Sequence, residues 1–172
     1  MLSDIPEGAG CYLDLLPYAT IFYYHLIGVP TFSDECSDLL KWIELGRVQG
    51  VTSSVALAEA THKVMLAEVV HRHGVAHQGL IARLKRHPEL LDGLTSHHRV
   101  VATVRSLRLP VEAITLDLLA RGATLSIQER LLTNDALTLA VMKQLGVTVL
   151  ATNDDDFDTI SGITLDKIRH KV

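Results

Sequence analysis

The sequence has few cysteines and no long apolar run. Its two cysteines, Cys11 and Cys36, match no metal-ligand spacing, which argues against a disulfide framework or a cysteine-based zinc site. No apolar stretch approaches the ~20 residues that span a bilayer. The amino terminus has neither a basic start nor an apolar run of signal-peptide length. We therefore expect a cytoplasmic protein with no membrane partner.

An excess of positive charge is also missing. Twenty acidic residues outnumber sixteen Lys and Arg, and the formal net charge is −4. Binding of a nucleic acid would therefore need a local basic patch or a bound cation. Apolar residues make up 48% of the chain and charged residues 21%, a composition typical of a folded globular protein. The length predicts one domain, residues 1–172.

Strand-like apolar runs alternate with helical periodicities along the chain, which predicts the α/β class with a central parallel sheet and helices on both faces. Residues 74–108 have the composition of two further helices and predict an added helical hairpin. The predicted strands are residues 11–13 (ending at Asp14), 48–52, 111–115, 147–151 and an edge strand at 161–165. The predicted helices are residues 18–27, 33–45, 53–71, 116–121 and 135–145, the last capped by Asn134.

Four acidic residues fall at strand ends or in helices that face the same edge of this sheet. Asp14 follows the first strand, Glu59 lies inside an apolar helix, Asp135 opens a helix and Asp154 follows a strand. Gathered carboxylates repel one another unless a cation offsets the repulsion. Mg²⁺ suits such a cluster because it prefers oxygen ligands and keeps several waters.

Each of these residues also has a purely structural interpretation. Asp14 and Asp154 could be turn residues, and Asp135 could serve the helix dipole. Glu59 is harder to explain in this way, because burying an unpaired glutamate among alanines is costly. Four coincidences at consistent positions favour the cation site.

Basic residues concentrate in the middle helices, where they form either a phosphate-tracking rim beside the acidic cluster or ordinary solvated helix faces. They are Lys63, His71, Arg72, His73, Arg83, Lys85, Arg86, His87, His97, His98 and Arg99.

Three segments in order, CYLD, SSVALAEAT and NDALTLAVMKQLGVTVLATNDDDF, resemble the PIN-domain ribonucleases, especially the VapC-type toxins of toxin-antitoxin pairs. The third segment is the most specific. The resemblance implies a three-layer α/β/α fold and an endoribonuclease that depends on Mg²⁺ or Mn²⁺. By position, the catalytic and metal-binding quartet would be Asp14, Glu59, Asp135 and Asp154, with Asp156 as a further metal ligand and Thr152 and Asn134 as supports.

The sequence departs from the family pattern after the first carboxylate. PIN domains usually follow their first Asp with a small polar residue and then Asn or Ser, whereas Leu15, Leu16 and Pro17 follow Asp14 here. A polar contact near the metal would be lost by this change.

The resemblance also implies partners: an RNA substrate, a cognate antitoxin protein and a second copy of the chain in a homodimer. Residues 15–27 are apolar and rich in tyrosine, and they are either a partner-binding face or part of the core. Two alternative functions stay open, a non-catalytic PIN-like module that binds RNA or protein, and another metal-dependent phosphoryl hydrolase.

Overall fold

The computed structural model describes residues 14–28 and 30–167. Strand β1 (Asp14–Pro17) is an inner strand of its main sheet. It pairs with β2 (Gln49–Gly50) on one side and β5 (Val149–Ala151) on the other, and β6 (Thr164–Asp166) forms the edge beyond β5. All these pairings are parallel. A second parallel pair joins β3 (Thr52–Ser53) to β4 (Val111–Glu112). Leu15, Leu16 and Leu150 are fully buried, as expected for strands covered on both faces.

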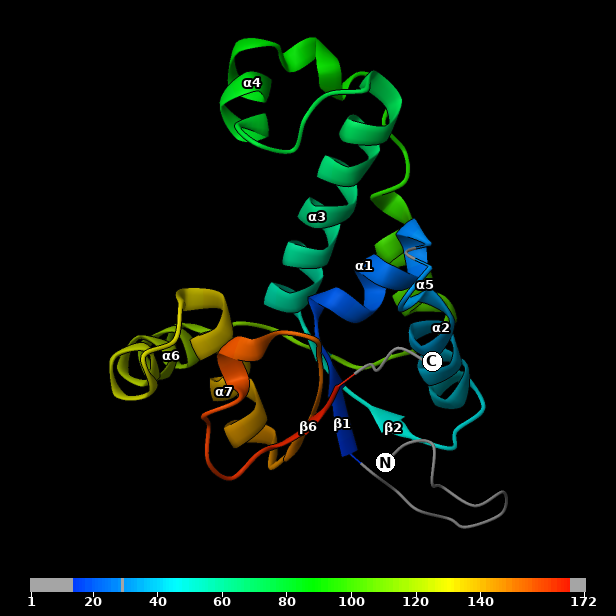
Figure 1. Ribbon diagram of the computed structural model, residues 1–172. Helices are drawn as coiled ribbons and strands as arrows, with labels where there is room; N and C mark the ends of the chain where they lie inside the picture. The colour runs from blue at the N-terminus through cyan, green and yellow to red at the C-terminus, as the bar shows by residue number, and fades with distance from the viewer. Residues whose placement is uncertain (1–13, 29, 168–172) are drawn as a thin grey trace.

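Helices cover the sheet on both sides and confirm the α/β/α class (Figure 1). Helices α6 and α7 pack against each other on one side of β1, and α1, α2 and α5 lie on the other. The helices are α1 (Ala19–Ile27), α2 (Ser33–Glu44), α3 (Ser54–His73), α4 (Leu80–Arg86), α5 (His98–Ser106), α6 (Leu116–Glu129) and α7 (Thr133–Leu145), with short 3-10 turns η2 (Pro88–Leu91) and η3 (Asp155–Phe157).

A helical arm, residues 75–94, sits at the far end of the long helix α3 (Figure 1). The arm has its own small apolar cluster with α3, separate from the main core. Helix α5 leaves the arm and returns to the main core through Val100 and Val104. The members of the arm cluster are Leu66, Val69, Val75, Leu80, Leu84 and Leu94.

Most predicted elements are present, and several of their boundaries differ because of contacts with other parts of the fold. The predicted strand at 48–52 is split between β2 and β3, which belong to different sheets. The helix predicted to end at Arg121 continues to Glu129, because Gly122 lies against Leu137 of α7 and supports a close helix contact. The tyrosine-rich stretch contributes largely to the core through residues such as Ile21 and Phe22.

The first strand continues beyond its predicted end at Asp14, as far as Pro17. Residues 11–13 lie outside the described part of the chain, and β1 begins at Asp14 where the sequence predicted a strand end. Among the described helices, none is long and apolar enough to cross a bilayer.

Candidate functional site

A pocket of about 460 Å³ opens at the carboxyl edge of the sheet, between α3, α7 and the loop after β5. This is the edge where open α/β sheets bind ligands. Its lining residues are Glu59, Leu132, Thr133, Asn134, Asp135, Asp154 and Asp156. Three members of the predicted quartet and the extra ligand Asp156 therefore share one pocket.

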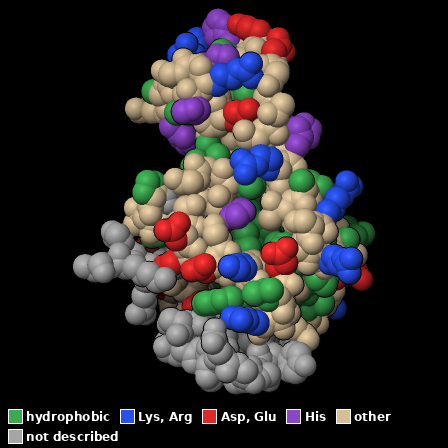
Figure 2. Space-filling view, turned by 90° about the vertical axis from the view of Figure 1, so that its right-hand side faces the viewer, with side chains coloured by type: hydrophobic (Ala, Val, Ile, Leu, Met, Phe, Trp, Pro, Cys, Tyr) green, Lys and Arg blue, Asp and Glu red, His purple; other side chains and the backbone are tan. Residues whose placement is uncertain are grey.

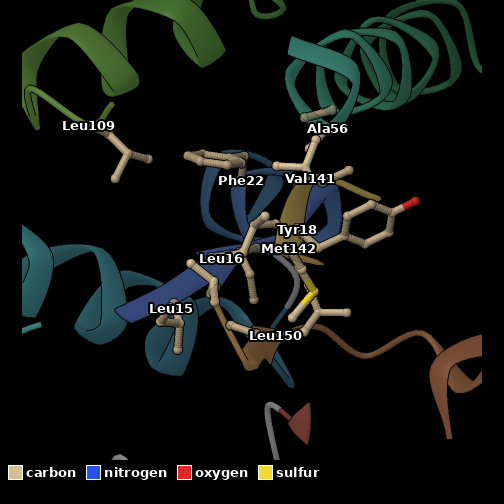
Figure 3. Close-up of a cluster of buried hydrophobic side chains, with 14 of the residues drawn as sticks. Leu15, Leu16, Tyr18, Phe22, Ala56, Leu109, Val141, Met142 and Leu150 are labelled. Atoms are coloured by element: carbon tan, nitrogen blue, oxygen red, sulfur yellow. The ribbon is translucent and has the colours of Figure 1, made fainter. Parts of the chain in front are cut away.

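Tyr18 lies beneath these carboxylates, immediately after β1. Its backbone N–H donates to the carbonyl of Ala151 at 3.0 Å, which fixes it at the carboxyl edge. The ring is 1% exposed and packs edge-on against Phe157, with ring centroids 5.7 Å apart. In Figure 3 the ring lies among the apolar side chains, with its hydroxyl directed away from neighbours such as Leu16 and Met142.

The Tyr18 hydroxyl joins two carboxylates. It lies 2.7 Å from Oδ1 of Asp135 and 2.9 Å from Oε2 of Glu59, within hydrogen-bond distance of both. A phenol carries one proton and donates to one carboxylate at a time. Burial, followed by the hydrogen bond to Asp135, raises the pKa of Tyr18. The hydroxyl therefore stays protonated and remains a donor.

Asp135 is the deepest of the carboxylates. It lies in the first turn of α7 and is 6% exposed. Burial raises its pKa, the hydrogen bond from Tyr18 opposes this change, and the negative charges of Asp154 and Glu59 raise the pKa further. The carboxyl group thus sits in a site where negative charge is already in excess.

Glu59 is held by contacts from three directions. Besides Tyr18, Lys63 one turn further along α3 forms an ion pair with its Oε1 at 2.7 Å. The side-chain amide of Asn134 donates to its Oε2 at 3.2 Å. The prediction that Asn134 caps α7 is wrong, because the helix begins at Thr133 after Leu132, whose side chain makes no capping hydrogen bond. Asn134 instead links α7 to the carboxylate on α3.

Thr152 shapes the loop that carries Asp154. Its hydroxyl is fully buried and accepts the backbone N–H of Asp154 at 3.0 Å. The Asp154 carboxylate in turn accepts the N–H of Asp156 at 3.1 Å. Asp154 is half-buried and Asp156 is exposed at the mouth of the pocket.

Asp14 is not brought to this edge of the sheet. Its backbone pairs with Gln49 at the start of β1, and Pro17 at the other end pairs with Ala151. Four residues of strand, at about 3.3 Å each, place Asp14 about 13 Å before Tyr18. Tyr18 occupies the strand-end position that the sequence assigned to the first carboxylate.

The residues after Tyr18 strengthen this correction. Ala19 and Thr20 follow it, a small residue and then a small polar one, which is closer to the family pattern after the first Asp than Leu15 and Leu16 are. The hydroxyl of Thr20 is buried and has no hydrogen-bond partner. Tyr18 was not identified as a site residue from the sequence. One signal could have identified it: Leu15 and Leu16 form an apolar, strand-like pair directly before a helix start, which places the strand end after Asp14.

The middle helices carry both signs of charge. Figure 2 shows histidines, basic side chains and acidic side chains mixed on the arm at the top of the molecule. There Nδ1 of His87 lies 3.0 Å from Oε1 of Glu89, so a histidine and an acidic side chain are in direct contact on the arm. The arm presents no surface of a single sign on this face, which favours solvated helix faces over a phosphate-tracking rim.

The donor set of the pocket suits a hard cation. Mg²⁺ is commonly held by one or two carboxylates, with water and substrate phosphate completing its shell. Asp135 and Asp154 meet that need, and both line the pocket. Within residues 14–28 and 30–167, no three His, Cys, Asp or Glu side chains are grouped as a ready-made metal site. The carboxylates that line the pocket are oxygen donors of the kind that Mg²⁺ takes one or two at a time.

Comparison with known proteins agrees with the fold. The family model of the PIN domain matches residues 19–163, beginning one residue after Tyr18. A similar solved structure is VapBC2 from Rickettsia felis bound to a DNA fragment from their promoter, with a TM-score of 0.53 and 15% sequence identity over 90% of this chain and 98% of that chain. The comparison with curated proteins gave no match. Since the family model covers most of the sequence, the chain belongs to the PIN domain family.

Proposed function

We propose that this chain is a toxin-type endoribonuclease that hydrolyses RNA phosphodiester bonds with Mg²⁺ or Mn²⁺. The observation that carries the proposal is the convergence of Glu59, Asp135, Asp154 and Asp156 on one pocket at the carboxyl edge of the sheet. The chain's membership of the PIN domain family supports a nuclease role in general. A pocket with four acidic residues repels RNA phosphate by itself, and a divalent cation reverses the sign of that interaction.

In this proposal Asp135 and Asp154 hold the ion, and the other residues shape the pocket around them. When bound, the ion would lower the pKa of a water and offset charge on the leaving oxygen. Lys63 and Asn134 hold the carboxylate of Glu59 at the pocket. Thr152 fixes the loop that presents Asp154. Asp156 at the mouth is a further oxygen donor for the ion or its waters.

RNA cleavage by site variants tests this function. The full chain is assayed on single-stranded RNA with Mn²⁺ or Mg²⁺, with EDTA, and as Asp135→Asn and Asp154→Asn. We expect EDTA and either variant to lower the cleavage rate by about 100-fold or more. Asp155→Asn is the matched control, because Asp155 is exposed in the same turn and pairs with Lys167. Undiminished cleavage in EDTA or in Asp154→Asn would contradict the proposal.

As a toxin of this type, the chain binds two partners: a cognate antitoxin and a second copy of itself. The similar structure from Rickettsia felis is a VapBC2 complex, which motivates the search for an antitoxin. Co-expression with the product of a short upstream reading frame should give a complex that co-elutes in size-exclusion chromatography and cleaves less RNA. Light scattering on the isolated chain should give twice the monomer mass of 18.9 kDa.

A second candidate is a non-catalytic PIN-like module. It is favoured by the contacts of Glu59, whose carboxylate is already satisfied by Lys63, Asn134 and Tyr18. This candidate predicts that calorimetric titration with millimolar Mn²⁺ gives no binding heat and that RNA stays intact. Metal-dependent cleavage that is lost in Asp154→Asn would exclude it.

A further inference from the structure

The Tyr18 hydroxyl occupies the space between two carboxylates that come from different helices. Glu59 belongs to α3 and Asp135 to α7, and each has an oxygen within 2.9 Å of the hydroxyl. Two carboxylates this close repel each other unless a donor or a cation lies between them. In this chain a neutral phenol is placed where it reduces that repulsion.

The position of this hydroxyl is fixed by the fold. The backbone of Tyr18 is tied to Ala151 of β5, and its ring is buried against Phe157. Pro17 directly before it pairs in register with Ala151. The phenol is therefore held in place behind two residues that line the pocket, Glu59 and Asp135, and is not free to swing away from them.

We propose that Tyr18 is a positioning residue that takes the place of a cation ligand: its hydroxyl holds Glu59 and Asp135 together and competes with a divalent ion for Asp135. A carboxylate at this position would complete a tight cation site. This inference deepens the proposed function and rests on it, because it assigns the pocket a weak affinity for the ion.

Two physical differences between a tyrosine and a carboxylate here support the inference. The protonated phenol brings no negative charge toward the ion, and its hydrogen bond uses Oδ1 of Asp135, an oxygen that an ion would otherwise use. An aspartate at residue 18 is shorter, so it would leave room for an ion where the phenol now lies. It would also add a negative charge facing that room.

Calorimetric titration of the full chain with MnCl₂ tests the inference. The variants are Tyr18→Asp, Tyr18→Asn and Tyr18→Phe. Tyr18→Asn is the matched control, because it opens the same space without adding charge. We expect Tyr18→Asp to bind Mn²⁺ about tenfold or more tightly than both Tyr18→Asn and the natural chain. Tyr18→Phe should bind about threefold more tightly than the natural chain, because the competing hydrogen bond is gone.

Two outcomes would overturn the inference. The first is a Tyr18→Asp variant that binds Mn²⁺ no more tightly than Tyr18→Asn. The second is a Tyr18→Phe variant that binds more weakly than the natural chain, which would show that the hydroxyl supports the ion. If circular dichroism shows Tyr18→Asp to be unfolded, Tyr18→Phe decides, because it keeps the ring. The proposed function fails separately, through RNA cleavage that does not depend on Asp154, so the two failures are distinguishable.

Discussion

The hydroxyl oxygen of Tyr18 lies 2.7 Å from Oδ1 of Asp135, a residue 117 positions further along the chain. This contact joins the end of β1 to the first turn of α7, and the same hydroxyl reaches Glu59 on α3. One buried polar atom therefore links three elements beside the pocket. Changes at this atom should alter the stability of the fold as well as the chemistry of the pocket.

Tyr18→Phe should lower the free energy of unfolding by about 2 kcal/mol at neutral pH in the absence of metal. The variant keeps the ring contact with Phe157 and removes the donor, so two adjacent carboxylates face each other without a proton between them. Urea denaturation measures the difference. Tyr23→Phe, at a half-buried position on α1, should stay within about 0.5 kcal/mol of the natural chain. A Tyr18→Phe variant as stable as the natural chain would show that the hydroxyl contributes nothing.

Thr152→Val should damage the loop that carries Asp154 without changing the size of the side chain. The variant removes the acceptor for the Asp154 N–H and leaves that group unsatisfied beside a buried side chain. We expect faster amide exchange at Asp154 and metal-dependent RNA cleavage about tenfold slower. Thr124→Val on the exposed face of α6 is the control, since its hydroxyl only bonds back to Ala120. Unchanged exchange at Asp154 would contradict this role for Thr152.

The helix-strand unit of α7 and β5 was predictable from sequence because its signals are local. Apolar residues recur at helical spacing, and Gly146 ends α7 with a positive φ of 70°. The apolar run after it forms β5. These local patterns are sufficient to place Asp135 and Asp154 at the same edge of the sheet.

The position of β1 could not be obtained in this way. Pro17 suggested a helix start, yet it is the last residue of a strand whose position is fixed by pairing with β5, more than 130 residues away. Pairing across that distance leaves no local pattern. The role of Tyr18 was hidden for the same reason, because the two carboxylates it contacts lie 41 and 117 residues further along the chain.

Gly122→Val should destabilise the protein by about 2 kcal/mol through the contact between α6 and α7. A Cβ at this residue would lie 2.7 Å from Cδ2 of Leu137 and 3.5 Å from its Cα, and Leu137 is itself buried. The Leu137 side chain would have to move to make room, and its burial limits where it can go. Ala123→Val, at the exposed neighbouring position, measures the helix-propensity cost alone. This variant should lower the free energy of unfolding by about 0.5 kcal/mol. Equal effects of the two variants on urea denaturation would disprove a tight contact at Gly122.

Glu68→Gln should weaken the attachment of the helical arm in a pH-dependent way. Burial alone would raise the pKa of Glu68, but the backbone N–H groups of Thr95 and Ser96 donate to its carboxylate, and the net pKa is lowered from 4.5. Because the pKa is lower in the folded state, the charged carboxylate stabilises the fold at pH values above the unfolded-state pKa. This stabilisation is lost as the pH falls through the folded-state pKa. At neutral pH the variant should therefore lose about 1 kcal/mol of protection at the amides of Thr95 and Ser96, a value kept small by solvent screening. The difference should vanish as the pH falls through the folded-state pKa of Glu68. Asp38→Asn on the exposed face of α2 is the control, and a difference between Glu68→Gln and the natural chain that persists in acid would rule out the charge as its cause.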